Sequence, residues 1–418
     1  MDRTILHCDM NAFFASVEEL YDPRLRSGPM AVCGDPAGRH GIILAKNEQA
    51  KACGIVTAET VWQALKKCPS LMLVRPHHDR YRRYSAMVSE IYKRFTDLIE
   101  PFSIDESWLD VTGSIALFGD GRTIADEIRK IVREEIGLTL SAGVSFNKVF
   151  AKMGSDYKKP DATTVITRGN FRELLWPLPA ARLFFVGRST ADRLEQIGIA
   201  TIGQLAAADK TLLVAMFGKH GALIHDYANG LDDSPVSSGG DGAQARSVGN
   251  GITFRRDLTG TAELRRACIA LSDTVAGRLR KYRLKCGGVK VDIKDPYFKT
   301  ISRQKQLARP CNTAAEISRA AMEIIGAAWD PSSPVRMLTV TAISLADENE
   351  EEQLTISAIG DDSPEKAERI ERALDSIRNK YGSGSIKFGG MLDDDLGIAP
   401  GGYNDEEDII IQDEGGTE

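Results

Sequence analysis

Two adjacent carboxylates stand within an otherwise apolar stretch, Ser103 to Asp110, and this stretch constrains the fold of the chain most strongly. Its aromatic and branched residues, such as Ile104 and Trp108, are types that fill half-buried strands, so it predicts a strand or a tight hairpin. Side chains alternate between the faces of a regular strand, so Asp105 and Glu106 converge only at a strand end or a turn. Converging anions in an apolar setting repel each other and lose hydration, and a hard divalent cation is their natural compensation.

Solvated turn residues are the alternative for an Asp-Glu pair, because exposed carboxylates are the norm. The N-terminal stretch argues against it. Residues 4–10 form an apolar strand pattern with Asp9 near its end, and a helical pattern follows. Asp9 is then placed to share a cation with Asp105 and Glu106 across neighbouring strands. A large separation of Asp9 from the pair, or an ion pair between one of the three and a Lys or Arg, would contradict this arrangement.

The length of 418 residues exceeds one ordinary core, so two to four domains are expected. An apolar content of 42% with 27% charged residues is normal for a soluble globular protein. The sequence contains no apolar run of membrane-spanning length and no leader-like N-terminus, which predicts a cytoplasmic protein without membrane contact. Its seven scattered cysteines lack zinc-site spacing and are expected to be reduced core residues.

The net charge of −6 is unevenly distributed along the chain. Residues 392–418 hold ten acidic residues and no Lys or Arg, and this tail is expected to be disordered. Residues 240–346 hold 18 basic residues against nine acidic ones. The overall acidity therefore conceals a basic domain, whose charge suits a nucleic-acid backbone.

Two motifs together carry a specific resemblance. The first is DMNAFFASVE at residues 9–18, and the second is SIDESWLD at residues 103–110. With the later motifs below, they resemble the signature of Y-family DNA polymerases, nearest the bacterial DNA polymerase IV branch. The likeness extends to about residue 346 and more loosely to about residue 390. It implies a translesion polymerase that extends a primer opposite damaged template at low fidelity and without proofreading.

The resemblance implies a multidomain α/β fold of the right-hand polymerase type. The expected parts are an α+β palm (1–169) with a small fingers insert (about 28–75), a helical helix-hairpin-helix thumb (170–231), a linker (232–245), an α/β little finger (246–346), an acidic segment with a charged helix (347–391) and the acidic tail (392–418).

The family also implies the catalytic and metal-binding residues. Two Mg2+ ions would be held by Asp9, Asp105, Glu106 and the backbone carbonyl of Met10. Phosphoryl transfer needs mainly positioning and charge compensation, which two metal ions supply, and Mg2+ prefers a few carboxylates together with substrate phosphates.

The deoxynucleoside triphosphate has its own expected contacts. Phe14 matches the family's aromatic residue that faces the deoxyribose, where its ring would collide with a ribose 2′-hydroxyl. The family commonly has Ser-Tyr-Glu-Ala-Arg where this chain has residues 47–51, so that position 51 offers a lysine point charge in place of an arginine fork. The expected nucleotide-binding residues are Phe13, Phe14, Lys51, Lys152 and Lys159.

Primer-template DNA is the expected macromolecular partner of a monomer. Residues 185–205 resemble a helix-hairpin-helix, whose helix N-terminus binds phosphate without reading sequence, although Phe185 replaces the first glycine of the family's Gly-x-Gly. Strands expected at 289–294 and 299–305, with a helix at 313–328, predict a sheet with one cationic face. The expected DNA contacts are Gly187, Arg188, Arg246, Arg255, Arg256, Lys299 and Arg303.

The segment Gln353–Ile356 resembles a degenerate sliding-clamp peptide and is a candidate clamp contact. Two other functions stay open from sequence alone. One is a catalytically idle scaffold that binds DNA and recruits repair proteins. The other is a different two-metal nucleotidyl transferase, such as a cyclic-nucleotide synthase, which would not need the basic domain.

Overall fold

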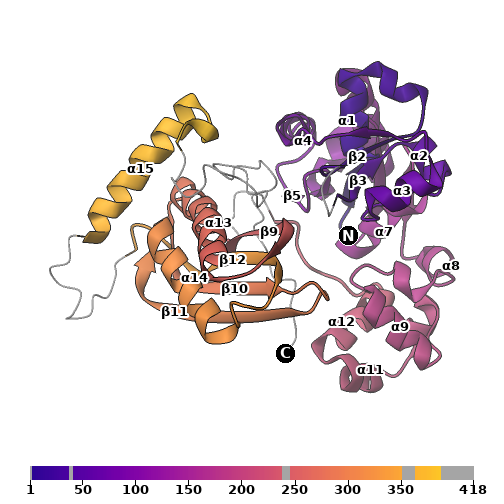
Figure 1. Ribbon diagram of the computed structural model, residues 1–418. Helices are drawn as coiled ribbons and strands as arrows, with labels where there is room; N and C mark the ends of the chain where they lie inside the picture. The colour runs from indigo at the N-terminus through magenta and orange to yellow at the C-terminus, as the bar shows by residue number, and fades with distance from the viewer. Residues whose placement is uncertain (1, 37–40, 238–244, 351–362, 387–418) are drawn as a thin grey trace. The chain divides into compact units, whose positions relative to one another are not determined.

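The computed structural model describes residues 2–36, 41–237, 245–350 and 363–386 (Figure 1). The chain divides into two compact units, Met1–Pro36 with Gly41–Gly242, and Ala37–His40 with Ala243–Glu418. No helix among the described residues is long and apolar enough to cross a membrane. All seven cysteines are free thiols, and six are buried, as expected of reduced core residues, whereas Cys53 is exposed.

A five-stranded sheet forms the centre of the first unit, in the order β5-β6-β1-β7-β8. Its strands are β1 (Ile5–Met10), β5 (Ile99–Pro101), β6 (Glu106–Asp110), β7 (Leu140–Ser145) and β8 (Thr163–Ile166). β1 runs antiparallel to both β6 and β7, and β5 pairs antiparallel with β6, which confirms the predicted hairpin. All of β1 is buried because helices cover both of its faces.

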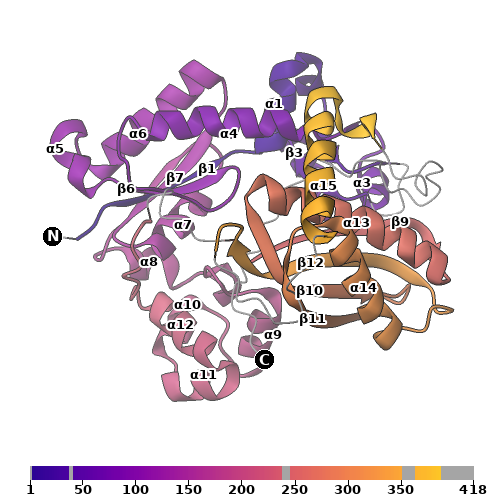
Figure 2. The same cartoon turned by 90° about the vertical axis from the view of Figure 1, so that its left-hand side faces the viewer.

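The two faces of this sheet have different chemistry. Helices α4 (His78–Tyr92) and α6 (Gly121–Ile131) lie on one face, and α7 (Lys148–Tyr157) lies on the other (Figure 2). Alternate β1 residues Leu6, Cys8 and Met10 belong to the apolar core beneath α4 and α6. Since side chains alternate along a strand, His7 and Asp9 project toward α7. Polar groups are thereby gathered on the α7 side.

A smaller three-stranded sheet, in the order β3-β2-β4, is inserted after the first helix. It contains β2 (Met30–Cys33), β3 (Ile43–Lys46), β4 (Met72–Val74), α2 (Glu48–Ala52) and α3 (Val61–Lys67), and it follows α1 (Phe13–Tyr21) and a short 3-10 helix at Pro23–Ser27. Asn47 and Thr60 cap α2 and α3 through their side chains. The insert has its own apolar core, which includes Ile43, Ile55 and Val61.

Short helices make up the remainder of the first unit. They are α5 (Ile115–Phe118), α8 (Phe171–Leu175), α9 (Arg188–Gln196), α10 (Ile202–Ala207), α11 (Lys210–Phe217) and α12 (Lys219–Ala228). Thr201 and Gln204 form a capping box at the start of α10, and the turn between α9 and α10 has the helix-hairpin-helix order predicted from the sequence.

The predicted linker is shorter than expected at its N-terminal end. Val236 is buried in a cluster with Ile5 and Trp108, and Arg3 donates a hydrogen bond to the carbonyl of Ser234 at 2.7 Å. Residues 232–237 therefore pack on the first unit. The rich content of Asp, Ser and Gly suggested a free tether, but composition does not reveal the buried Val236.

The second unit is an antiparallel sheet in the order β11-β10-β12-β9, with helices on one face (Figure 1). Its elements are β9 (Ser247–Leu258), α13 (Thr261–Lys281), β10 (Leu284–Lys294), β11 (Thr300–Cys311), α14 (Ala314–Ala328), β12 (Val335–Asp347) and α15 (Ser363–Tyr381). The predicted strands and both predicted helices of this region are confirmed. The core lies between the sheet and helices α13 and α14.

Candidate active site

The register of β1 and β6 builds the centre of the site. Asp9 is the direct cross-strand partner of Glu106, so their side chains share the face that α7 covers. The next residues turn sharply, because Ala12 adopts a left-handed backbone with φ 47° before α1 begins. Of the three predicted carboxylates, this register brings Asp9 and Glu106 together.

Two lysines compensate these carboxylates. Lys152 on α7 places Nζ 3.2 Å from Asp9 Oδ2 and 2.8 Å from Glu106 Oε2. Lys159 places Nζ 2.6 Å from the same Asp9 oxygen and 2.8 Å from Asp156 Oδ1. Asp9 is only 4% exposed, and buried anions are retained where cations and hydrogen bonds compensate them.

The expectation that these carboxylates would be free of ion pairs with lysine was wrong. The sequence assigned Lys152 and Lys159 to the nucleotide, and the fold places both of them on the acidic residues as well. Lysine is a flexible point charge, unlike the planar arginine fork, so an ammonium group can exchange one anionic partner for another. The ion pairs therefore show that a cation binds at this position, and either a lysine or a metal ion can be that cation.

Asp105 occupies the neighbouring strand end. Its carboxylate accepts a hydrogen bond from Ser103 Oγ at 2.7 Å, and its carbonyl accepts one from the Met10 N–H at 3.1 Å. It lines a pocket of about 290 Å³ between α4 and the β5–β6 turn, whose other polar lining includes Ser85 and Ser89. Asp105 thus lies beside the Asp9 and Glu106 pair, on the Met10 side of the strand.

The three acids differ in their acidity. Burial, reinforced by the negative charges of Asp9 and Glu106, raises the pKa of Asp105 to about 6. Burial also raises the pKa of Asp9, against the opposing effect of Lys159. Burial acts in the same direction on Glu106, but the ion pair with Lys152 opposes it, and the pKa is lowered to about 2. Such divergent pKa values in one small site are typical of functional carboxylates.

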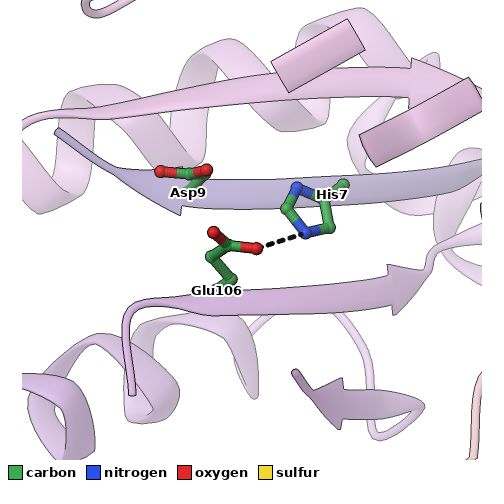
Figure 3. Close-up of side chains that lie close together, drawn as sticks. All are labelled: His7, Asp9 and Glu106. Carbon is green, nitrogen blue, oxygen red and sulfur yellow. Dashed lines mark ion pairs between the residues drawn. The ribbon is translucent and has the colours of Figure 1, made fainter. Parts of the chain in front are cut away.

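His7 was missed by the sequence analysis. Its ring is fully buried, packs edge-on against Trp108 with centroids 5.1 Å apart, and contacts Ser155 through Nδ1. The other ring nitrogen faces Glu106 (Figure 3). Burial lowers the pKa of this imidazole. The signal was present in the sequence, because His7 and Asp9 are two residues apart and so share one face of a strand.

An aromatic stack lies near the start of α1, the helix that follows the strand carrying Asp9. Phe14 is half-buried and stacks on Tyr81 of α4, with ring centroids 4.0 Å apart and planes 10° apart. Tyr81 donates a hydrogen bond to the buried Glu18 at 2.7 Å, which fixes the ring beneath Phe14. Phe13 is only 3% exposed and packs in the core. The two adjacent phenylalanines therefore have separate surroundings, and Phe13 is not placed to touch a nucleotide.

Lys51 lies in the inserted subdomain on α2. It is exposed and pairs within its own helix with Glu48, at 3.3 Å. Such a pair is weak in water and leaves the ammonium group accessible to a stronger anion.

The donor atoms of the acidic site fit a divalent metal ion. Carboxylate oxygens of Asp9 and Glu106 lie within 4.8 Å of each other and of a His7 ring nitrogen, in the only such metal-type group among the described residues. The backbones of Met10 and Asp105 adjoin them through the hydrogen bond from the Met10 N–H to the Asp105 carbonyl, and the Asp105 carboxylate is not part of this group. A few carboxylate oxygens this close together suit Mg2+, which needs few protein ligands because it also binds water and substrate phosphate.

The thumb residues expected at DNA lie at the start of α9. Gly187 is the N-cap and Arg188 is the first helical residue, and both are exposed. A side chain added at Gly187 would meet no atom within 4 Å, so the backbone there is open to approach. Phe185 has φ 70°, a left-handed conformation that glycine adopts more easily, at the position where the family has glycine.

The basic strand residues of the second unit do not share one face. Arg303 is opposite Val291 and Lys305 is opposite Val289, and both valines belong to the core beneath α13 and α14. Cross-strand partners lie on one face of a sheet. Lys305 accordingly forms an ion pair with Glu323 of α14. The prediction of one cationic face is therefore wrong for Arg303, because alternation in the sequence does not reveal strand register.

The open face instead carries Lys290 and Lys294, which pair across to Gln304 and Thr300. Arg256 is engaged by Glu263 of α13 at 2.5 Å, on the helix side. The other predicted DNA contacts, Arg246, Arg255 and Lys299, are exposed. The clamp candidate Gln353–Ile356 and the acidic tail 392–418 lie outside the described residues.

Comparison with known proteins agrees with this architecture. Residues 8–156 match the impB/mucB/samB family, and residues 245–356 match the C-terminal domain of that family. A DNA polymerase IV from Acetivibrio thermocellus is 44% identical over 395 residues, covering 94% of this chain and 98% of the relative. DNA polymerase IV 1 from Bacillus subtilis is 35% identical over 391 residues, covering 93% of each.

A solved structure shows the same fold. The Y-family DNA polymerase chimera Dbh-Dpo4(243-245)-Dbh superposes with a TM-score of 0.74 at 22% identity, covering 82% of this chain and 99% of the chimera. The fold is that of a right-hand polymerase with mixed α/β content, as the motifs predicted. The chain belongs to the impB/mucB/samB family, and its resemblance to Y-family polymerases of the DNA polymerase IV branch is confirmed.

Proposed function

We propose that this chain is a DNA-directed DNA polymerase that extends a primer opposite damaged template at low fidelity. The observation that carries the proposal is the cross-strand pairing of Asp9 with Glu106, next to Asp105, with two lysines of α7 and its C-terminal extension on the same carboxylates. The relatives named DNA polymerase IV cover nearly the whole chain, which supports assigning their activity to it.

The acidic residues hold the metal. Asp9, Asp105, Glu106 and the carbonyl of Met10 would hold two Mg2+ ions, which would compensate the charge that develops on the attacking 3′-oxygen and the leaving pyrophosphate. Lys152 and Lys159 leave the carboxylates and bind the triphosphate, since phosphate oxygens are competing anions within their reach. Lys51 adds a third positive charge from the inserted subdomain.

Phe14 selects the sugar. The stack on Tyr81 holds its ring, which supports a role as a rigid wall. We expect such a wall to collide with a 2′-hydroxyl on the incoming nucleotide. Phe14→Ala should therefore admit ribonucleotides, which is measured as the ratio of kcat/KM for a dNTP to that for the matching rNTP. Phe118→Ala, at an exposed aromatic residue of α5, is the control.

Duplex DNA binds through backbone contacts. The start of α9 at Gly187 and Arg188 takes a phosphate, because free N–H groups at a helix N-terminus bind anions. In the second unit Arg246, Arg255 and Lys299, with Lys290 and Lys294 of the open sheet face, supply cations that raise affinity without reading bases. Sites without base readout suit a polymerase that works on any sequence.

Primer extension by the purified full-length protein tests the proposal. Wild type should add deoxynucleotides to a primer on undamaged and abasic templates, and Asp105→Ala should abolish addition while DNA binding persists. Glu135→Gln removes an exposed carboxylate and is the matched control. DNA binding without any extension by wild type would favour the scaffold function, and formation of a cyclic nucleotide would favour the other nucleotidyl transferase.

A further inference from the structure

One buried nitrogen at the acidic site has no hydrogen-bond partner among the described residues. It is Nε2 of His7, whose side chain has no solvent exposure. Glu106 Oε2 is 3.4 Å away, which is longer than the usual distance of about 2.7–3.2 Å for an N–H···O hydrogen bond, and Figure 3 marks this contact as an ion pair. Buried polar atoms are nearly always satisfied in native proteins, so this atom points to a ligand.

Hydrogen bonds on the other side of the ring determine the tautomer. Ser155 Oγ donates its single proton to the carbonyl of Lys152 at 2.8 Å, so it accepts from Nδ1 of His7 at 2.9 Å. A neutral imidazole carries a proton on one nitrogen only. Nε2 therefore presents a lone pair to the carboxylates of Asp9 and Glu106. Lys152 compensates the two carboxylates, but none of the described residues donates a hydrogen bond to Nε2.

The three groups form a donor set of one nitrogen and two oxygens. His7 Nε2 and the carboxylate oxygens of Asp9 and Glu106 all lie within 4.8 Å of one another. Their spacing is set by two strands, since His7 and Asp9 alternate on β1 and Glu106 pairs with Asp9 on β6. One imidazole with two carboxylates suits Mn2+, Fe2+ or Co2+, whereas Mg2+ takes oxygen ligands.

We propose that His7 Nε2 is a direct ligand of a transition-metal ion held together with Asp9 and Glu106, so that this site prefers Mn2+ to Mg2+. The inference deepens the proposed function and rests on it, because it specifies which divalent cation the polymerase site selects. Lys152 contacts both carboxylates and therefore competes with the ion. Binding of the ion releases Lys152 toward the triphosphate.

Binding of Mn2+ alone to the full-length protein, without DNA or nucleotide, tests the proposal. Pulsed electron paramagnetic resonance should show ¹⁴N coupling from a bound imidazole. His7→Phe retains a ring against Trp108; it should remove this coupling and weaken Mn2+ binding by about tenfold or more, with Mg2+ binding changed by less than about twofold. His225→Phe removes another histidine with a buried unpaired nitrogen and should change neither property.

Several results would overturn the proposal. The first is that the wild type does not bind Mn2+. The second is that Asp9→Asn abolishes Mn2+ binding but the bound ion shows no ¹⁴N coupling in the wild type. The third is that His7→Phe leaves the Mn2+ affinity unchanged. If His7→Phe fails to fold by circular dichroism, the wild-type spectrum decides. Lys152→Met should tighten Mn2+ binding severalfold, and unchanged affinity would contradict the competition. A wild type that shows the coupling but does not extend primers would count against the proposed function alone.

Discussion

Each unit of this protein contains a buried cluster of charged groups, and the cations of these two clusters differ. In the first unit, Lys152 and Lys159 serve Asp9 and Glu106. In the second unit, which is held together at α13, α14 and α15, the cations are arginines. The arginine cluster consists of Asp273, Arg280, Glu371, Asp375 and Arg378.

The geometry of the arginine cluster is fixed at many points. Arg280 is 5% exposed and binds both oxygens of Asp375, at 2.6 and 2.9 Å, together with Glu371 and the carbonyl of Asn312. Glu371 also accepts from the Ala314 N–H at the start of α14, at 2.9 Å. A planar guanidinium matches carboxylates through two parallel bonds, so this cluster fastens α15 to the unit.

The lysine pairs lack this redundancy. Lys152 and Lys159 have single ammonium nitrogens on flexible stems, and they serve carboxylates that substrate or metal can claim. The difference shows that a buried ion pair has no single meaning. An arginine with several partners stabilises the fold. A lysine on an active-site carboxylate can be replaced there by a metal ion, and it can then bind a substrate phosphate instead.

The largest expected effect is a loss of activity without a loss of stability when a carboxylate of the lysine cluster is removed. Asp9→Asn should lower kcat for primer extension by roughly a thousandfold or more, because several kcal/mol of charge stabilisation are lost in the transition state. The midpoint of thermal unfolding should not fall, since burial already raises the pKa of Asp9 and the amide is easier to bury. A large loss of stability with retained activity would remove the distinction between the clusters.

Arg280→Met should have the reverse outcome. It leaves Glu371 and Asp375 without their cation, and breaking a buried pair in this way costs about 3–5 kcal/mol. Hydrogen exchange measured by mass spectrometry should become faster in residues 363–381 and at the start of α14, while single-nucleotide addition by the folded protein persists. The double variant Arg280→Met with Glu371→Gln should recover part of the protection, and no recovery would contradict direct coupling.

Lys152→Arg tests whether the lysine must be able to leave. An arginine at this point can bind Asp9 and Glu106 together through its fork, so primer extension should fall by about tenfold, with the loss in kcat. Lys152→Met should reduce primer extension less than Lys152→Arg, because methionine cannot form an ion pair with Asp9 and Glu106. An arginine variant as active as wild type would mean that release of this cation does not limit the reaction.

Asp105 predicts a pH effect confined to the first unit. Its pKa of about 6 in the folded chain exceeds its ordinary value of 3.8, mainly because of burial. The folded state therefore retains a proton that the unfolded state loses, so this contribution to stability is present below about pH 4 and is lost as the pH rises through about 6. Urea unfolding at several pH values should show this decline, and Asp105→Asn should flatten it.

The smallest effect is expected for an exposed pair. Arg94 and Glu135 are each about half exposed and bind through two bonds at 2.6 Å. Glu135→Gln should leave the free energy of unfolding nearly unchanged, because water and salt screen the pair. A loss comparable to that of Arg280→Met would show that bidentate geometry matters more than burial.

The sequence by itself determined the β5–β6 hairpin, the helical thumb region, parts of β10 and β11, helices α14 and α15 of the second unit, and the family. Those features follow from local patterns of apolar residues, caps and turns, and from motifs long enough to be specific. It also identified Asp9 and Glu106 as candidate ligands, because carboxylates within apolar strands are rare unless they share a cation.

Only the tertiary structure decided the partners of those residues. Register placed Asp9 opposite Glu106, His7 beside them and Arg303 on the helix side of its sheet, and a register shift of one residue would exchange the faces. The lysine pairs and the burial of Val236 likewise depend on segments far apart in the chain. Local sequence sets what a residue can do, and packing between distant segments sets which group it meets.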